Sequence, residues 1–152
     1  MAGGGIERIV VGVDGSDQSG AALDWAIRLA KGMGSEVIAV FALDVPLWPV
    51  EPYISAPPPP IDIEWRTEME KAFNERWCKP LRDAEVKYQA IMDQGRPATV
   101  IRSIAEGMDA DLIVLGRRGR GEVAELVLGS VSHEVALHSP LPVLLIPHHT
   151  DG

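Results

Sequence analysis

The sequence predicts one α/β domain, a three-layer sandwich in which a five-stranded parallel sheet lies between two layers of helices. Five short apolar runs rich in β-branched residues recur along the chain, and segments with the 3–4 residue spacing of amphipathic helices alternate with them. Alternation of this kind builds parallel sheets covered by helices on both faces. The 152 residues fit a single domain, and neither an internal repeat nor a linker between separate cores divides them.

The first strand is predicted at residues 8–14, whose continuous apolar run is typical of a strand buried on both faces. Ser16 or Ser19 can then cap a helix that stops at Gly34. Residues 36–43 form the second predicted strand. The apolar positions of the helix fall on one face and are Ala22, Trp25, Ala26, Leu29, Ala30 and Met33.

Residues 44–62 interrupt this rhythm with seven prolines, four of them consecutive at 57–60. Proline removes amide donors and blocks helix and central strand alike, so we expect a loop inserted within the domain. Its role stays open between a lid, a dimer arm and no function. A long helix should follow it, with Pro80 kinking its last turns. The core-facing residues of that helix recur every four positions and are Trp65, Met69, Phe73, Trp77 and Leu81.

The second half of the chain continues the alternation. The third strand is predicted at 85–92, and a turn at 93–97 precedes a helix from Ala98 to Met108. A fourth strand at 110–116, a last helix at 130–139 and a fifth strand at 141–147 complete the sheet. Residues 1–5 and 148–152 are expected to be flexible ends.

Composition excludes several function classes. The net charge of −8 argues against a general nucleic-acid binder, which needs a basic face. No segment approaches the roughly 18 apolar residues of a membrane span, and the first residues lack a secretory-signal layout, so we expect a cytoplasmic protein without membrane contact. Cys78, the single cysteine, is expected to be buried, and it permits neither a disulfide framework nor a cysteine zinc site. His133 and His138 point in different directions on a helix, so no metal site is predicted.

Ligands of open parallel sheets bind beyond the carboxyl ends of the strands, and three features of this sequence lie there. One is the stretch 12–16, another surrounds Ala42, and the third is the glycine-rich loop that follows the fourth strand. That loop is either a plain connector or a cradle for phosphates. Glycines allow close backbone approach, arginines neutralise phosphate charge, and free amides at a helix start favour an anion. The residues that would do this are Gly116, Arg117, Arg118, Gly119, Arg120, Gly129, Ser130 and Ser132.

The glycine spacing resembles the nucleotide motif of the universal stress protein family. Gly116, two residues, Gly119, nine residues and then Gly129–Ser130 follow that motif. The stretches VVGVDGS, ADLIVLGRRGRG, LGSVS and PVLLIP also resemble the family pattern in order and spacing, so the resemblance covers nearly the whole chain.

The resemblance implies a Rossmann-like, adenine-nucleotide α-hydrolase-like fold, and one branch of the family binds ATP through this motif. Mg²⁺ would accompany the phosphates, held more by them and by water than by the protein. The family commonly forms homodimers through the last strand, here Val143, Leu144, Leu145 and Ile146. Transferred by position, the adenine and ribose end is lined by Gly12, Val13, Asp14 and Ala42, and the phosphates lie by Gly116, Gly119, Gly129, Ser130, Val131 and Ser132.

The function expected from these observations is that of an ATP-binding, nucleotide-responsive regulator in stress adaptation. Fast phosphoryl transfer needs a placed base and metal ligands, and the sequence indicates no catalytic residue, so hydrolysis should be slow at most. Two alternatives are a dimeric interaction protein that binds no nucleotide and a binder of AMP or a cyclic nucleotide. A dedicated enzyme would need a catalytic constellation that the sequence does not reveal. Asp14 itself is either a nucleotide ligand or a turn and capping residue, and both roles can coexist.

Overall fold

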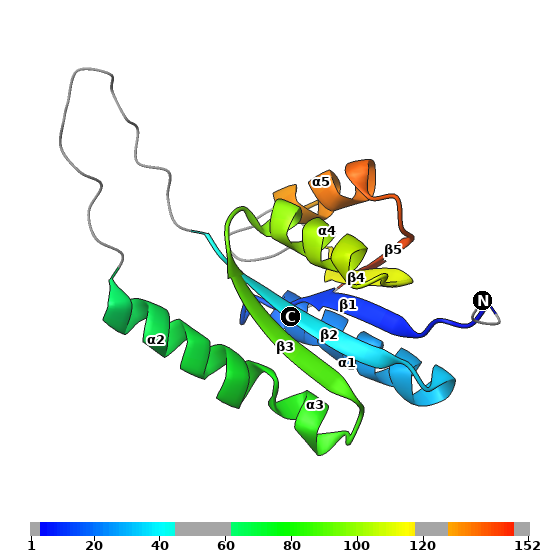
Figure 1. The fold of residues 1–152 in the computed structure, drawn as a ribbon, viewed down its shortest axis with the longest axis horizontal. Coiled ribbons are helices and arrows are strands. Elements are labelled where there is room, and N and C mark those ends of the chain that lie inside the picture. Colours follow the sequence, from blue (N-terminus) through cyan, green and yellow to red (C-terminus); the bar gives the residue numbers. More distant parts are fainter. Residues whose placement is uncertain (1–3, 45–61, 118–127, 148–152) are drawn as a thin grey trace, which may run out of the picture.

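The computed structural model describes residues 4–44, 62–117 and 128–147 (Figure 1). Within these ranges the chain alternates strands and helices as the sequence predicts. Their order is β1 (Arg8–Gly12), α1 (Asp17–Met33), β2 (Glu36–Leu43), α2 (Ile63–Lys71), the π-helix η1 (Ala72–Trp77), α3 (Lys79–Asp83), β3 (Tyr88–Gln94), α4 (Pro97–Gly107), β4 (Leu112–Gly116), α5 (Ser130–His138) and β5 (Val143–Ile146).

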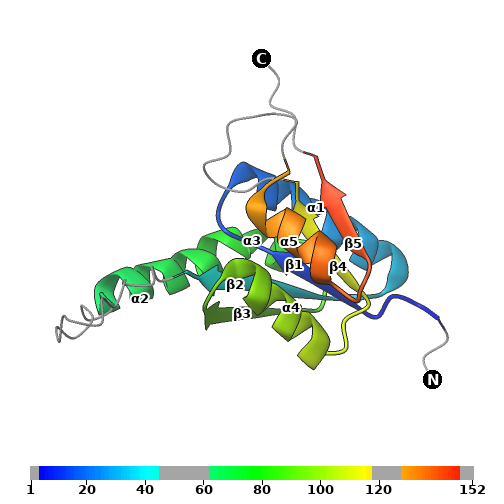
Figure 2. The same cartoon turned by 90° about the horizontal axis from the view of Figure 1, so that it is seen from above.

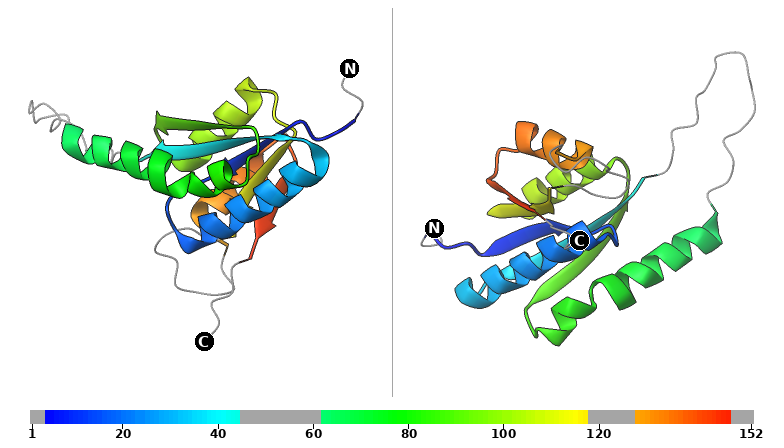
Figure 3. Two further views of the ribbon diagram at one scale, coloured as in Figure 1. Left: turned by 90° about the horizontal axis from the view of Figure 1, so that it is seen from below. Right: turned by 180° about the vertical axis from the view of Figure 1, so that it is seen from behind.

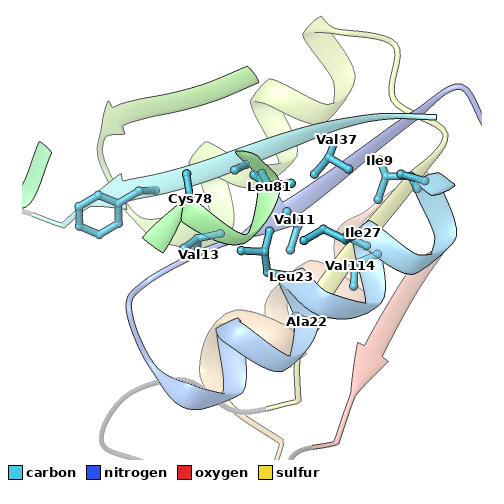
Figure 4. Packing of buried hydrophobic residues seen from close by; sticks show 14 of the residues in the cluster. Ile9, Val11, Val13, Ala22, Leu23, Ile27, Val37, Cys78, Leu81 and Val114 are labelled. Carbon is cyan, nitrogen blue, oxygen red and sulfur yellow. The ribbon is translucent and has the colours of Figure 1, made fainter. Parts of the chain in front are cut away.

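The five strands form one parallel sheet in the order β3-β2-β1-β4-β5, which confirms the predicted fold class. Helix α1 covers one face together with η1 and α3, while α4 and α5 cover the other (Figures 1 and 2). Alternate residues of the central strand β1 pack against the helices on opposite faces of the sheet, because successive side chains of a strand point to opposite faces. Ile9 and Val11 pack under α1, as Figure 4 shows, and Val10 packs under α4.

Helix α1 begins and ends where the sequence predicts. The Ser16 hydroxyl caps its start by accepting a hydrogen bond from the Ser19 amide at 3.1 Å, and Gly34 ends it in the left-handed conformation at φ 71°. The expected apolar face is wrong at its margins, since Trp25 is 40% exposed beneath the Arg28 guanidinium and Met33 is 43% exposed. The line of contact with the sheet runs along the small side chains of Ala22, Ala26 and Ala30, which leaves those larger residues on its flank.

The long helix predicted after the proline-rich stretch is divided into α2, η1 and α3, and Pro80 lies in the first turn of α3, consistent with the predicted reset near that proline. Trp77 packs edge-on against Phe41, with 5.1 Å between ring centroids, and Phe73 is fully buried beside them. The prediction that Trp65 belongs to the core is wrong: it is 40% exposed, because α2 buries none of its residues and extends past the sheet (Figure 3).

Cys78 is fully buried under the sheet, as expected, and burial raises the pKa of its thiol to about 11 against the opposing influence of the Arg82 guanidinium. A thiol with this pKa stays protonated at neutral pH, so its contribution here is packing.

The third strand starts later than predicted, at Tyr88 rather than at residue 85. Hydrogen bonds from the Ala84 amide to the Pro80 carbonyl and from the Glu85 amide to the Arg82 carbonyl continue the end of α3. Glu85 then takes a left-handed φ of 57°, which a strand residue does not adopt.

Some sequence predictions fall on residues that the structure does not describe. They concern residues 45–61 of the proline-rich insertion, Arg118, Gly119 and Arg120 of the glycine loop, and the terminal residues 1–3 and 148–152. Asp44 and Asp62, which bound the insertion, are exposed, and the Asp62 carboxylate caps α2. None of the helices in the described ranges is long and apolar enough to cross a membrane.

A candidate ligand cavity at the carboxyl edge of the sheet

A cavity opens at the carboxyl ends of β1, β2 and β4, where the chain leaves β1 toward one face of the sheet and β4 toward the other. This is the topological switch point at which α/β sheets bind ligands. The hollow encloses about 530 Å³, including solvent at its mouth, which suits a small organic ligand rather than a single ion. Its lining residues are Gly12, Val13, Asp14, Ser19, Val40, Phe41, Ala42, Pro97, Ile101, Leu115, Gly116, Val131 and Ser132.

The floor of the cavity is closed by side chains that meet over Gly12. A Cβ atom at Gly12 would lie 2.7 Å from Cδ2 of Leu115 and 3.1 Å from Cδ1 of Ile101, both closer than van der Waals contact. Leu115 and Ile101 are buried and line the same cavity. Because Gly12 has no side chain, Leu115 of β4 and Ile101 of α4 can pack closely against β1.

Asp14 lines the cavity from the turn between β1 and α1. Its Oδ1 atom accepts hydrogen bonds from the Ser16 amide at 2.9 Å and from the Ser16 hydroxyl at 2.5 Å. Gly15 between them has a φ of 80°, which favours glycine. The turn-forming role of Asp14 is thus present in the structure, and the residue also lines the cavity.

Ala42 presents its backbone to the cavity. The Val40 carbonyl accepts the Val13 amide at 2.8 Å on the β1 side, and the Leu43 carbonyl accepts the Gly95 amide at 3.0 Å on the β3 side. Since these directions alternate along a strand, the N–H and C=O of Ala42 face the β1 side. The pairing of β1 with β2 ends at Gly12 and Val40, so both groups of Ala42 point past the end of β1.

Hydrogen bonds join the two ends of the glycine-rich loop. The Gly129 amide donates to the Arg117 carbonyl at 2.9 Å, and the Ser132 hydroxyl donates to the Gly116 carbonyl at 2.6 Å. These bonds hold the start of α5 against the end of β4. Gly129 is the N-cap of α5, and with no side chain it leaves the first amides of the helix without a side-chain cap.

The structure brings most, but not all, of the sequence-predicted site residues to this cavity. Of the thirteen, the seven that line it are Gly12, Val13, Asp14, Ala42, Gly116, Val131 and Ser132. Arg117, Gly129 and Ser130 lie beside it without lining it, and Arg118, Gly119 and Arg120 are outside the described residues. In the described ranges no group of three or more His, Cys, Asp or Glu side chains could hold a metal ion, and His133 and His138 are exposed on α5.

Sequence reasoning missed six lining residues as ligand contacts. They are Ser19, Val40, Phe41, Pro97, Ile101 and Leu115. Val40, Phe41 and Leu115 directly precede strand ends that the sequence does indicate. Pro97 and Ile101 start α4, and nothing in their local pattern shows that this helix begins over the cavity.

Solved structures share this fold over nearly their whole length. The structure of the hypothetical protein MJ0577 superposes with a TM-score of 0.74 at 27% identity, covering 96% of this chain and 99% of that one. A universal stress protein in complex with cAMP matches with a TM-score of 0.70 at 24% identity, over 93% of this chain and 97% of that one. One from Archaeoglobus fulgidus in complex with dAMP has a TM-score of 0.67 at 24% identity, with coverages of 92% and 97%.

Sequence comparison assigns the chain to a family. A universal stress protein of Thermus aquaticus, from the QAH/OAS sulfhydrylase 3′ region, is 35% identical over 138 residues, which cover 91% of this chain and 96% of that protein. MJ0531, a universal stress protein of Methanocaldococcus jannaschii, is 34% identical over 146 residues, covering 92% of this chain and 81% of its own length. The model of the universal stress protein family matches residues 5–147. The chain therefore belongs to the universal stress protein family.

Proposed function

We propose that this protein binds an adenine nucleotide, ATP in the first place, in the cavity at the carboxyl edge of its sheet. The observation that carries the proposal is the set of groups that the strand order brings to that cavity. Strand β2 contributes the backbone of Ala42, the turn after β1 contributes the Asp14 carboxylate, and β4 contributes Gly116, to which Ser132 of α5 is hydrogen-bonded. Solved structures of the same fold in complex with cAMP and dAMP support the choice of ligand class.

The base would lie between apolar side chains and be read by the backbone. Pro97 and Val131 line the cavity from α4 and α5, and apolar walls with a few placed polar groups are typical of small-molecule sites. The adjacent N–H and C=O of Ala42 offer one donor and one acceptor. On the edge that carries N7, adenine presents the N6 amino donor beside the N7 acceptor, whereas guanine places two acceptors, O6 and N7, so a backbone donor and acceptor that read this edge favour adenine.

The phosphates would lie toward the amides at the start of α5. Uncapped amides and the helix dipole favour an anion there, and α5 begins at Ser130 beside Gly116. The sequence adds three arginines in the loop, of which Arg117 lies in the described part. Mg²⁺ would be held by phosphate oxygens and water, since the described residues supply no cluster of carboxylates for it.

Regulation by the bound nucleotide, with slow hydrolysis at most, fits this site better than rapid catalysis. Among the described lining residues Asp14 is the only side chain that titrates, and its Oδ1 is already engaged by Ser16. Rapid phosphoryl transfer needs in addition a placed base and metal ligands. We place the protein in the cytoplasm, where its single buried thiol needs no oxidising environment.

We also propose that the protein forms a homodimer through β5. β5 is an edge strand of the sheet, and the prolines at 142 and 147 lie outside it. Leu144 packs toward the α1 layer and Val143 and Leu145 toward the α4 layer, but all three remain partly exposed. An apolar edge with free amide donors pairs readily with the same edge of a second copy.

Isothermal titration with ATP, AMP, cAMP and GTP tests the function directly. Val131→Trp should fill the cavity and weaken ATP binding by at least about tenfold, or 1.4 kcal/mol. Leu137→Trp is the matched control, because Leu137 is on the same helix but is 64% exposed and does not line the cavity. Circular dichroism checks that both variants fold. A parent that binds none of these nucleotides, or equal ATP binding by both variants and the parent, would refute the proposal.

A further inference from the structure

Helices α4 and α5 provide two walls of the cavity and pack together on the same face of the sheet (Figures 1 and 2). Pro97 lines the cavity from the first turn of α4, and Val131 lines it from the first turn of α5. Next to these two residues an ion pair joins the helices: Nη2 of Arg96 lies 3.3 Å from Oε2 and 3.5 Å from Oε1 of Glu134. Arg96 directly precedes Pro97, and Glu134 follows Val131 by about one helical turn. The ion pair therefore links the two walls without lining the cavity itself.

The two walls are anchored unequally. Helix α5 has nine residues and buries only Ser132 and Val135, and the Ser132 hydroxyl ties its start to the Gly116 carbonyl of β4. Helix α4 buries twice as many residues, which are Ala98, Val100, Ile101 and Ala105. A link between the helices therefore steadies α5 more than α4. The Glu134 carboxylate provides that link on the side of α5 that faces α4.

We propose that Arg96 and Glu134 are positioning residues whose ion pair holds the α4 and α5 walls at the spacing that the nucleotide needs. This inference rests on the proposed nucleotide function and adds two residues that act on the ligand only through the walls. A wall fixed before the ligand arrives loses less freedom on binding, and affinity scales with the fraction of molecules whose cavity is ready to bind. The two side chains are 66% and 29% exposed. An exposed ion pair changes an equilibrium by about 1.5- to 5-fold, which sets the expected effect on that fraction.

The first test removes the ion pair from either side and measures ATP binding by titration calorimetry. Arg96→Gln and Glu134→Gln should each weaken ATP binding by about 1.5- to 5-fold. A direct effect of charge on the phosphates would instead strengthen binding in Glu134→Gln, because this change removes a negative charge. Glu106→Gln is the control: it changes the charge equally, but Glu106 is exposed near the end of α4 and does not line the cavity, so this variant should bind as the parent does. If Glu134→Gln binds ATP as tightly as the parent, within about 1.5-fold, or more tightly, the inference is overturned while the nucleotide function stands. A parent that does not bind ATP overturns both.

The second test restores the ion pair in reverse. The double variant Arg96→Glu/Glu134→Arg should bind ATP within about 1.5-fold of the parent, because the two charges attract again. The difference in ATP affinity between the parent and Glu134→Gln should also narrow in 1 M NaCl, where the Debye length falls to about 3 Å and exposed ion pairs are screened. Circular dichroism and thermal unfolding check that the variants fold. A double variant that binds as weakly as the single ones, or an affinity difference that salt leaves unchanged, overturns the inference. Variants with a lower Tm and unchanged ATP affinity overturn it too, because the ion pair would then stabilise the fold alone.

Discussion

Gly12→Ala offers the sharpest test of how the cavity floor is built. The added Cβ would lie 2.7 Å from Cδ2 of Leu115 and 3.1 Å from Cδ1 of Ile101. Carbon atoms in good contact are about 3.5–4.0 Å apart, so both neighbours must move. Both are the ends of flexible side chains, but both residues are only 4% exposed, so the space into which they can shift is the cavity that they line.

The expected loss of stability is the balance of two opposing effects. Overpacking of a buried contact typically costs about 1–3 kcal/mol. Alanine also lowers the conformational entropy of the unfolded chain, which stabilises the folded state by about 0.4–1 kcal/mol where alanine can adopt the native backbone conformation. This condition should hold at Gly12, whose φ is not positive. Because overpacking outweighs that gain, the variant should lose about 1–2 kcal/mol of stability, which lowers the Tm of a chain this size by roughly 2–8 °C. Gly32→Ala is the control: nothing lies within 4 Å of its added Cβ, so that variant should be as stable as the parent or more so.

A double-mutant cycle identifies the atom responsible. Leu115→Val removes Cδ2 and by itself costs about 1 kcal/mol from the lost methylene and the resulting cavity. In that background Gly12→Ala should cost close to nothing, which gives a coupling energy of about 1–2 kcal/mol between the two positions. Urea unfolding of the four proteins measures it. If the two changes add within about 0.5 kcal/mol, the steric account of Gly12 is wrong. Loss of ATP binding in Gly12→Ala with no loss of stability would instead point to ligand approach as the reason for the glycine.

Three further predictions use other parts of the structure. Asp14→Ala should weaken ATP binding at least about tenfold and also lower the Tm, because the carboxylate both lines the cavity and forms the turn. A lower Tm with unchanged ATP affinity would show that Asp14 forms the turn but does not bind the nucleotide. Leu144→Lys should shift a homodimer toward monomer by placing a charge on the β5 edge, and light scattering over a dilution series measures this; a parent that is monomeric at tens of micromolar contradicts it. The pKa of the Cys78 thiol is raised from 9.0 to about 11 in the folded state, so between these pH values the folded protein keeps a proton that the unfolded chain has lost. The free energy of unfolding should therefore fall as pH rises from 9.0 to about 11. Urea unfolding should show a shallower fall in Cys78→Ala, and identical pH profiles of variant and parent would argue against the raised pKa.

Local sequence patterns were most reliable where the physics is local. The limits of α1 follow from a hydroxyl at Ser16 that accepts an amide and from a glycine at 34 that takes a left-handed conformation, and neither requires a distant residue. The same holds for the second strand, predicted and observed at residues 36–43. The predicted start of the third strand is three residues too early, because hydrogen bonds at the end of α3 and the left-handed conformation of Glu85 leave no trace in the apolar pattern.

The class of fold, the family and the strand ends at which a ligand can bind are predictable from the sequence, because alternation, glycine spacing and capping depend on residues near one another in the chain. Which side chains face the cavity and which apolar residues are covered depends on how distant segments pack together. The sequence pattern puts Trp65 and Trp77 on one helical face, yet only Trp77 meets Phe41, because Trp65 lies at the start of α2, which extends past the sheet, while Met69 near its end packs against the core. Likewise Pro97 and Ile101 reach the cavity only because the strand order β3-β2-β1-β4-β5 carries α4 across the end of β1. Periodicity sets the direction of a side chain, and the layer opposite it, assembled from distant segments, sets what that side chain contacts.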